Sequence, residues 1–208
     1  MTAQARFVVA GAGGHAKVLI ATIEAAGGDV VRVLDDDPAR CGEFVLGHRV
    51  EGPISDDLIP AWAHLVLGVG SNRARKDLDR RLHATYGVVV HPSAVVHPSV
   101  TLGAGSVVFA GAIIQPGTEI GRHVIVNTAA SVDHDCCLGD FVHVAPGVCL
   151  AGHVRIEEGA FMGMGSCAIP DARVGAWATV GAGGVVLTKI PAGATAVGVP
   201  ARVVGSQR

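Results

Sequence analysis

A histidine with a carboxylate on each side is a strong candidate for acid–base chemistry, in the segment Val132-Asp-His-Asp-Cys136. Histidine titrates near neutral pH, so His134 is suited to remove a proton from an attacking amine or hydroxyl. A carboxylate on the other ring nitrogen fixes the tautomer and raises the basicity of the imidazole, and Asp135 is the candidate for this role. Successive residues of a strand point to opposite faces, so Asp135 reaches the neighbouring ring only where the chain turns a corner. The segment predicts a general base, with a solvent-exposed corner histidine as the alternative.

A glycine-rich segment, Gly11-Ala-Gly-Gly-His-Ala16, has the spacing of a nucleotide-binding turn. It follows an apolar run and opens a helical pattern, and glycines there let the backbone approach a phosphate at the helix N-terminus. Asp35 and Asp36 follow Gly11 by 24 and 25 residues at the end of a second apolar run, where a carboxylate would hold a ribose. An 88-residue segment is short for a dinucleotide fold, so we predict one nucleoside diphosphate as ligand. A tight turn without a ligand is the alternative.

The elements that must position this turn alternate between strand and helix. Apolar runs predict buried strands, and apolar residues spaced three and four apart predict helices, the second capped by Ser71 or Asn72. The predicted strands are 6–10, 30–34 and 65–69, and the predicted helices are 14–26, with Val18, Leu19, Thr22 and Ile23 on its apolar face, and 73–85. This alternation indicates a small parallel sheet with a Rossmann-like arrangement.

The second half of the chain has a period of six residues instead. Every sixth residue from Val90 to Val186 is apolar, seventeen in a row, and the residue four places later is mostly small. Such a repeat is the signature of a solenoid. Three hexads, or 18 residues, form one triangular coil, and each strand then pairs with its copy 18 residues later. Glycine fills the corners, where the backbone needs positive φ. The predicted fold is therefore a small α/β domain followed by a parallel β-helix of five to six coils.

Composition agrees with this fold and excludes several classes of protein. Glycine accounts for 29 of 208 residues, aromatic residues for only 4% and charged residues for 16%. The net charge of −2, with no basic stripe, disfavours a nucleic-acid binder. The long uncharged stretch 98–118 is interrupted by glycines and a proline, so no membrane span is expected. Five cysteines without framework spacing, and no evident signal peptide, predict a cytoplasmic location.

Four motifs together resemble those of a known enzyme family: Gly11-x-Gly-Gly-His-x-Lys17, Leu34-Asp-Asp36, Gly70-Ser-Asn-Arg73 and His91-Pro92 before the repeats. The repeat is similar to that of the hexapeptide-repeat acyltransferases, and the whole layout resembles the PglD-type nucleotide-amino-sugar N-acetyltransferases. Sialic-acid O-acetyltransferases of the NeuD type share the layout. The resemblance implies a left-handed β-helix, a homotrimer with active sites between subunits, and acetyl-CoA as co-substrate without a metal. Residues 1–88 would bind the nucleotide sugar and residues 89–208 acetyl-CoA.

The resemblance also implies roles for individual residues. His134-Asp135 matches the family's histidine–acid pair, and the amide of Gly152, 18 residues after His134, would stabilise the oxyanion. The residues expected to bind substrate are Gly11, Gly13, Gly14, His15, Asp35, Asp36, Asn72, Arg73 and His143, the last near the acetyl group or a neighbouring subunit. The residues expected to bind the cofactor are Gly152, Gly165, Gly183, Lys189, Pro200, Ala201 and Arg202.

Some of these assignments keep a simpler alternative. Gly147, Gly165 and Gly183 form a column at 18-residue spacing that would admit the pantetheine arm, or they are plain corners. Lys189 and Arg202 would contact CoA phosphates, or they are solvated surface charges. Of the remaining histidines, His91 and His97 precede prolines and are predicted to be structural, whereas the corner residues His123 and His153 are predicted to be solvated. The close histidine pair of the zinc carbonic anhydrases with this repeat is missing, so no catalytic metal is expected.

The predicted function is acetyl-CoA-dependent N-acetylation of a nucleotide-linked amino sugar by direct attack, with His134 as base. One alternative is O-acetylation of a sugar hydroxyl, which would use the same residues. Another is a non-catalytic nucleotide-sugar-binding protein built on a β-helix, which would not bind acetyl-CoA. Nucleotidyl transfer is disfavoured because the N-terminal domain is too small. The sequence leaves open whether the nucleotide is UDP, GDP or dTDP.

Overall fold

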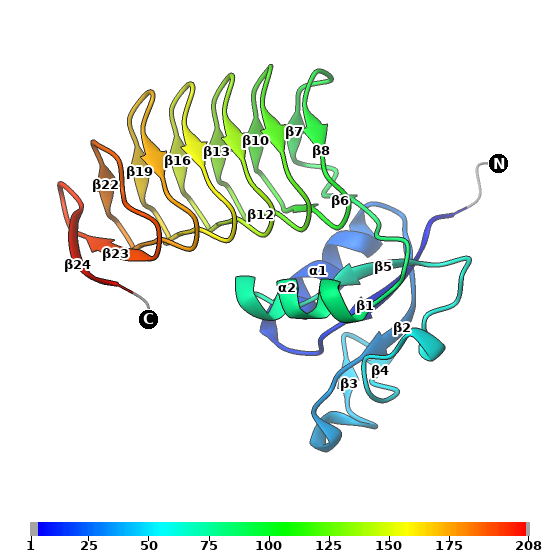
Figure 1. Ribbon diagram of the computed structural model, residues 1–208. Coiled ribbons are helices and arrows are strands. Elements are labelled where there is room, and N and C mark those ends of the chain that lie inside the picture. The colour runs from blue at the N-terminus through cyan, green and yellow to red at the C-terminus, as the bar shows by residue number, and fades with distance from the viewer. Residues whose placement is uncertain (1–3, 207–208) are drawn as a thin grey trace. The chain divides into compact units, whose positions relative to one another are not determined.

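The structure is a computed structural model that describes residues 4–206, and the chain forms two compact units that divide between Pro92 and Ser93 (Figure 1). The predicted fold class is confirmed: a small α/β unit with a parallel sheet precedes a parallel β-helix. Within the described part of the chain, no helix is long and apolar enough to cross a membrane.

The first unit is built on a parallel three-stranded sheet in the order β2-β1-β5. Its elements are β1 (Arg6–Ala10), α1 (Gly14–Ala25), β2 (Asp29–Leu34), the 3-10 turn Pro38–Arg40, β3 (Phe44–Val45), β4 (His48–Arg49), the 3-10 turn Asp56–Leu58, β5 (His64–Leu67), α2 (Asn72–Arg81) and β6 (Val89–Val90). Central strand β1 is buried from Phe7 to Ala10, as expected for a strand covered on both faces.

The two helices differ from expectation in detail. Helix α1 buries Ala16, Leu19, Ile20, Thr22 and Ile23, whereas the predicted core residue Val18 is 42% exposed. The buried stripe therefore lies to one side of the face that was assigned from spacing alone. Helix α2 begins at the predicted cap, because the hydroxyl of Ser71 accepts the Ala74 N–H at 3.4 Å. It ends at Arg81 rather than near 85, because the chain there returns beside β5, where the Thr85 carbonyl accepts the Leu65 N–H at 2.9 Å.

The second unit consists of two-residue strands that stack coil upon coil (Figure 1). The strands are β7 (Val95–Val96), β8 (Thr101–Leu102), β9 (Val107–Val108), β10 (Ile113–Ile114), β11 (Glu119–Ile120), β12 (Ile125–Val126), β13 (Ser131–Val132), β14 (Cys137–Leu138), β15 (His143–Val144), β16 (Cys149–Leu150), β17 (Arg155–Ile156), β18 (Phe161–Met162), β19 (Cys167–Ala168), β20 (Arg173–Val174), β21 (Thr179–Val180), β22 (Val185–Val186), β23 (Ala194–Val197) and β24 (Arg202–Ser206).

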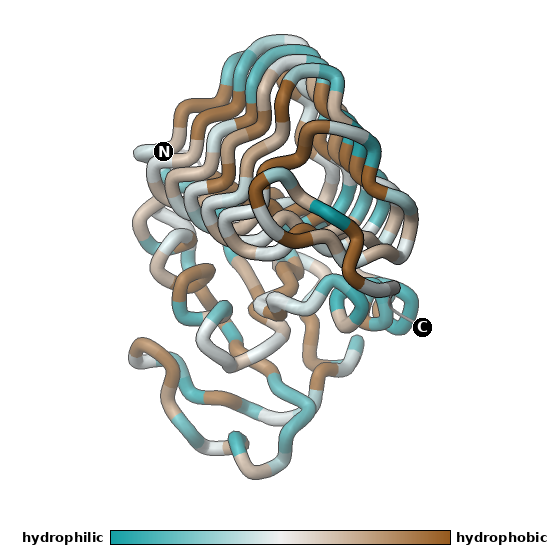
Figure 2. The backbone as a smooth tube through the Cα atoms, turned by 90° about the vertical axis from the view of Figure 1, so that its left-hand side faces the viewer, coloured by the Kyte–Doolittle hydropathy of each residue, from teal (hydrophilic) through white to brown (hydrophobic). Residues whose placement is uncertain are grey.

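These strands form three parallel sheets around an apolar interior. The first sheet holds β7, β10, β13, β16, β19 and β22; the second holds β8, β11, β14, β17 and β20; the third runs from β9 through β12, β15, β18 and β21 to β23, with β24 antiparallel at its end. Each strand pairs with the one 18 residues later, as Ser131 does with Cys149. The hydropathy pattern repeats from coil to coil (Figure 2), and interior residues such as Val126 and Val144 are fully buried.

The corners between the sheets share one backbone conformation. Every sixth residue from 105 to 183 has positive φ, and seven of these fourteen residues are not glycine. We call the three corner columns the polar corner (Gly117, Asp135, His153 and Asp171), the aromatic corner (Gly105, His123, Phe141, Gly159 and Trp177) and the bare corner (Gly111, Ala129, Gly147, Gly165 and Gly183). Glycines two places earlier in the hexad, such as Gly163, do not have positive φ. A Cβ at Gly163 would lie 2.5 Å from the Val180 carbonyl oxygen, so glycine is needed there for close stacking of the coils.

The aromatic corner corrects one expectation. His123 was expected to be solvated, but it is fully buried and its ring stacks on Phe141, with centroids 5.2 Å apart and planes 7° apart. Gly105, one coil earlier, has no side chain, and a Cβ there would collide with the His123 ring. The histidine at this corner therefore packs as an aromatic residue between coils.

Candidate active site

His134 and Asp135 lie at the polar corner between β13 and β14. The Nδ1 atom of His134 is 2.8 Å from Oδ2 of Asp135, so the carboxylate bonds the ring of its own neighbour. The φ of +57° at Asp135 makes this possible, because it turns the side chain back at the corner. Gly117, one coil earlier, leaves the space for it, since a Cβ there would collide with the Asp135 carboxylate.

The surroundings of His134 favour a basic ring nitrogen. Asp135 accepts a proton from Nδ1, which leaves the lone pair on Nε2. This hydrogen bond raises the pKa of His134 above its ordinary value, and the charges of Asp133 and Asp135 act in the same direction. Oδ1 of Asp133 also accepts the backbone N–H of His134 at 2.8 Å. The side chains of His134 and Asp135 are 51% and 52% exposed, so the base is accessible to a substrate.

Gly152 lies directly beneath the ring of His134. A Cβ at this position would be 2.6 Å from both Cε1 and Nε2 of His134, so only glycine allows the ring to lie there. Among the described residues the structure gives the Gly152 N–H no acceptor. The next residue is tied to the base, because the His153 N–H donates to the His134 carbonyl at 3.0 Å. An N–H donor and a base therefore lie side by side on consecutive coils.

His153 belongs to the same cluster, although sequence reasoning placed it only on a solvated corner. It is exposed as expected, but its ring meets His134 edge to face with centroids 5.1 Å apart, and its Nε2 is 3.9 Å from Oδ2 of Asp135. The donor atoms of His134, Asp135 and His153 lie within 4.8 Å of one another. The signal that could have found His153 is its position 18 residues after Asp135, one coil further along the same column.

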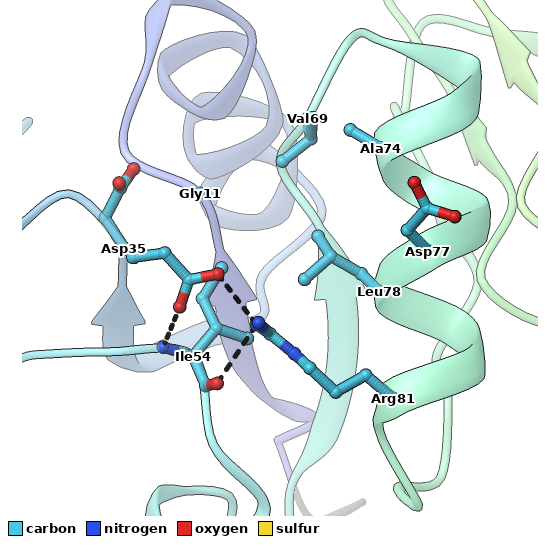
Figure 3. A pocket seen from close by; sticks show the side chains of 9 residues that line it. Gly11, Asp35, Ile54, Val69, Ala74, Asp77, Leu78 and Arg81 are labelled. Carbon is cyan, nitrogen blue, oxygen red and sulfur yellow. Dashed lines mark hydrogen bonds and ion pairs between the residues drawn. The ribbon is translucent and has the colours of Figure 1, made fainter.

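A second candidate site is a pocket of about 390 Å³ in the first unit (Figure 3). Gly11, Asp35 and Asp36 line it, together with apolar side chains. Gly11 has φ +114° and a Cβ there would lie 2.9 Å from the Gly68 carbonyl oxygen, so the turn requires glycine. Asp35 supports the same turn, because its Oδ2 accepts the Ala12 N–H at 2.7 Å.

Helix α2 supplies the opposite wall of this pocket. Arg81 reaches across toward Ile54 (Figure 3), donates to its carbonyl at 3.1 Å and forms an ion pair with Asp36 at 2.7 Å. Sequence reasoning missed this wall. Its residues are Ala74, Asp77, Leu78 and Arg81. Their spacing of three, four and seven marks one face of a helix, which is the signal that could have identified them.

Comparison with known proteins agrees with both sites. Residues 6–82 match the family described as PglD N-terminal domain. The acetyltransferase domain of PglB from Neisseria gonorrhoeae FA1090, solved with acetyl coenzyme A, is 37% identical, has a TM-score of 0.88, and the match covers 97% of this chain and 100% of that one. PerB from Caulobacter crescentus, solved with CoA and GDP-perosamine, is 41% identical with a TM-score of 0.88, and the match covers 99% of both chains.

The chain belongs to the hexapeptide-repeat sugar acetyltransferases. A curated relative, GDP-perosamine N-acetyltransferase from Escherichia coli O157:H7, is 32% identical over 127 residues. That match covers 58% of this chain and 58% of the relative, and a match to serine acetyltransferase from Buchnera aphidicola covers 47% of that protein. The chain thus spans only about half the length of these curated relatives.

The remaining substrate residues predicted from this acetyltransferase family lie outside the pocket of Figure 3. Gly13 caps α1 and Gly14 opens it, with open space where a Cβ would be. His15 follows them, and burial, aided by the charge of Arg75, lowers its pKa to about 4, so it is neutral at neutral pH. Asn72 accepts from buried Arg75 at 3.0 Å, and Arg73 is exposed. The roles of all five remain predictions.

The other predicted residues of the β-helix are spread over its faces. His143 lies in β15 of the third sheet, where its Nε2 is 3.1 Å from Nδ2 of Asn127. Gly165 and Gly183 lie on the bare corner. In the last coil, Lys189 and Pro200 are accessible, Arg202 begins β24, and the buried Ala201 donates its N–H to the Val185 carbonyl at 2.8 Å. Within one chain the structure does not bring these residues to His134.

Proposed function

We propose that this protein transfers the acetyl group of acetyl-CoA to the amino group of a nucleotide-linked sugar. The observation that carries the proposal is the polar corner, where Asp135 holds Nδ1 of His134 and Gly152 lies beneath the ring. The PglB domain solved with acetyl coenzyme A and PerB solved with CoA and GDP-perosamine support acetyl-CoA as the donor and an amino sugar as the acceptor.

The proposed reaction is a direct transfer within a ternary complex. The sugar amine attacks the carbonyl carbon of the thioester, so a C–N bond forms and the C–S bond breaks. Nε2 of His134 accepts the proton that the amine loses, and Asp135 stabilises the resulting imidazolium. The CoA thiolate leaves and takes up this proton. The Gly152 N–H donates to the oxyanion of the tetrahedral intermediate, a contribution of about 3 kcal/mol to the transition state.

The first unit is proposed to hold the nucleotide. Open space beside Gly13 and Gly14 at the N-terminus of α1 suits a diphosphate, because the free N–H groups and the helix dipole attract anions. The pocket beside Asp35 and Asp36 has the size and the carboxylates to receive the nucleoside. GDP-linked amino sugars are the first substrates to test, because PerB was solved with GDP-perosamine.

A homotrimer would complete this site. His134 lies at the corner between the first and second sheets, whereas His143 lies on the third sheet, on the other side of the coil. Packing three β-helices side by side would set the third sheet of one chain against the polar corner of another. We therefore propose that active sites form between subunits. A cytoplasmic location is proposed with it, because all five cysteines are free thiols.

A substrate panel tests the proposed function. The purified protein is incubated with acetyl-CoA and with GDP-, UDP- and dTDP-linked sugars that carry either an amino or only hydroxyl groups, and the release of CoA thiol is followed. We expect release with an amino sugar alone. Transfer to a hydroxyl instead would establish an O-acetyltransferase. If calorimetry detected no acetyl-CoA binding, the protein would be a nucleotide-sugar-binding protein and the proposal would be wrong.

A further inference from the structure

Three polar side chains inside the β-helix make the same pair of hydrogen bonds. Ser106, Thr118 and Cys136 all occupy the small interior position and are at most 1% exposed. Ser106 shows the pattern: its hydroxyl donates to the Gly121 carbonyl at 2.7 Å and accepts the Val124 N–H at 2.9 Å. Each of these side chains therefore holds both ends of the corner turn in the following coil.

The other two of these residues hold the two turns of the candidate active site. Thr118 donates to the Asp133 carbonyl at 2.8 Å and accepts the Cys136 N–H at 3.2 Å, which encloses the turn of His134 and Asp135. The thiol of Cys136 in turn donates to the Ala151 carbonyl at 3.1 Å, and its sulfur accepts the Val154 N–H. That second turn contains Gly152 and His153.

These turns differ from most corners of the β-helix. Elsewhere the turn is closed by a direct hydrogen bond, such as that from Ala130 N–H to the Asn127 carbonyl at 3.1 Å or from Ala160 N–H to the Glu157 carbonyl at 3.2 Å. Over residues 4–206, the turns 121–124, 133–136 and 151–154 have no such direct bond. An interior side chain takes its place, and its chemistry can therefore influence the turn.

The bond from Cys136 acts on one particular peptide group. The Ala151 carbonyl and the Gly152 N–H belong to the same peptide unit, so a donor that fixes the carbonyl also fixes the direction of the N–H. Hydrogen bonds in such a chain polarise one another, which makes the N–H a better donor. The thiol keeps its proton for this purpose, because burial raises the pKa of Cys136 to about 11.

We propose that Cys136 is a positioning residue for acetyl transfer, which aims and polarises the Gly152 N–H from inside the β-helix. This inference rests on the proposed function, in which that N–H receives the oxyanion. It assigns to a buried cysteine a role that requires its S–H group and neither a free thiolate nor a disulfide.

The test compares two substitutions at position 136 with one matched control. Cys136→Ala removes the donor, whereas Cys136→Ser keeps a donor of the kind that Ser106 already supplies in this β-helix. Ser106→Ala removes the equivalent pair of bonds at the aromatic corner, away from His134. We measure kcat and KM for both substrates and the melting temperature of each variant. Backbone amide shifts of the free protein report the Gly152 N–H without any need for activity.

We expect Cys136→Ala to lower kcat about tenfold with KM little changed, a fraction of the loss seen when an oxyanion donor is removed outright. Cys136→Ser should recover kcat to within about twofold, because the hydroxyl restores the bond to the Ala151 carbonyl. Ser106→Ala should lower the melting temperature but not kcat. The Gly152 amide proton should move upfield in Cys136→Ala and return in Cys136→Ser.

Equal kcat values for the wild type and Cys136→Ala would overturn the inference, as would a serine variant as slow as the alanine variant. If Cys136→Ala does not fold, the serine variant is compared with Cys136→Val, which fills the space without a donor; equal kcat in these two would also refute it. Failure of the proposed function looks different, because the wild type itself would then transfer no acetyl group.

Discussion

The polar corner and the bare corner of the β-helix repeat with the same pitch and nearly the same backbone, yet they offer opposite surfaces. Asp135 at the polar corner has φ +57°, and Gly147 at the bare corner has φ +68°. At the polar corner, glycines such as Gly152 are covered by the side chain of a neighbouring coil. At the bare corner, a Cβ on Gly147, Gly165 or Gly183 would meet nothing within 4 Å.

The difference shows that the coil supplies a platform and the side chains supply the chemistry. His123 and His153 make the same point, because both occupy a corner position with positive φ. His123 stacks between coils and is fully buried, whereas His153 lies open beside Asp135. The environment one coil away, rather than the repeat position, separates a packing histidine from one available for catalysis. The experiments below test this contrast between the polar and bare corners.

Removal of the base should give the largest effect at the polar corner. His134→Ala should lower kcat/KM by about 10²- to 10⁴-fold, because no other group in the cluster offers Nε2 in the same place. His97→Ala, an exposed histidine bonded to Ser99 on another part of the β-helix, is the matched control and should retain activity. The measurement is CoA release with an amino-sugar nucleotide. Near-normal activity of His134→Ala would show that the polar corner is not the catalytic one.

A methyl group at Gly152 should be almost as harmful. The Cβ of Gly152→Ala would lie 2.6 Å from Nε2 of His134, so the ring must move away from its position over the amide. We expect kcat to fall about a hundredfold, since both base and oxyanion donor are displaced. The double variant with His134→Ala should be no slower than His134→Ala alone. Additive losses would mean that Gly152 does not act through the base.

The pH profile should report the bond between Asp135 and His134. Asp135 raises the pKa of His134, so the neutral base predominates only above this raised value and activity falls as the pH decreases through it. Asp135→Asn should lower kcat about tenfold and move the acidic limb of the kcat profile to lower pH, toward the ordinary histidine value. Asp171→Asn, on the same corner column, should leave the limb in place. An unchanged limb in Asp135→Asn would contradict the pairing.

The bare corner should give the smallest effect, and it should appear in KM. Gly165→Ala forces a Cβ onto a residue with φ +65°, at a cost of about 1 kcal/mol in stability, and would narrow the proposed path of the pantetheine arm. We expect KM for acetyl-CoA to rise several-fold with kcat retained. Gly111→Ala, with φ +69° at the same corner, should show the same loss of stability without the change in KM. Equal KM values would identify the bare corner as a plain corner.

The parts of the site that could be predicted from the sequence are those fixed by the repeat. The phase of the hexads places His134 and Asp135 at a corner, and the 18-residue pitch places Gly152 one coil further on. Arg81 could not be predicted in the same way, because its partner Asp36 is 45 residues away and belongs to a different element. Asp36 and Arg81 meet only because α2 and the segment after β2 pack at the same edge of the sheet.

By itself the sequence determined the period, and with it the interior, the corners and the neighbours of each residue along the coils. A parallel β-helix repeats one backbone geometry, so local phase is enough to assign these positions. Only the tertiary structure decided which corner is packed, polar or bare, and that Cys136 bonds the peptide of Gly152. These features depend on the space and the hydrogen-bonding groups that the next coil provides, and a repeat with identical backbone angles at every corner does not specify them.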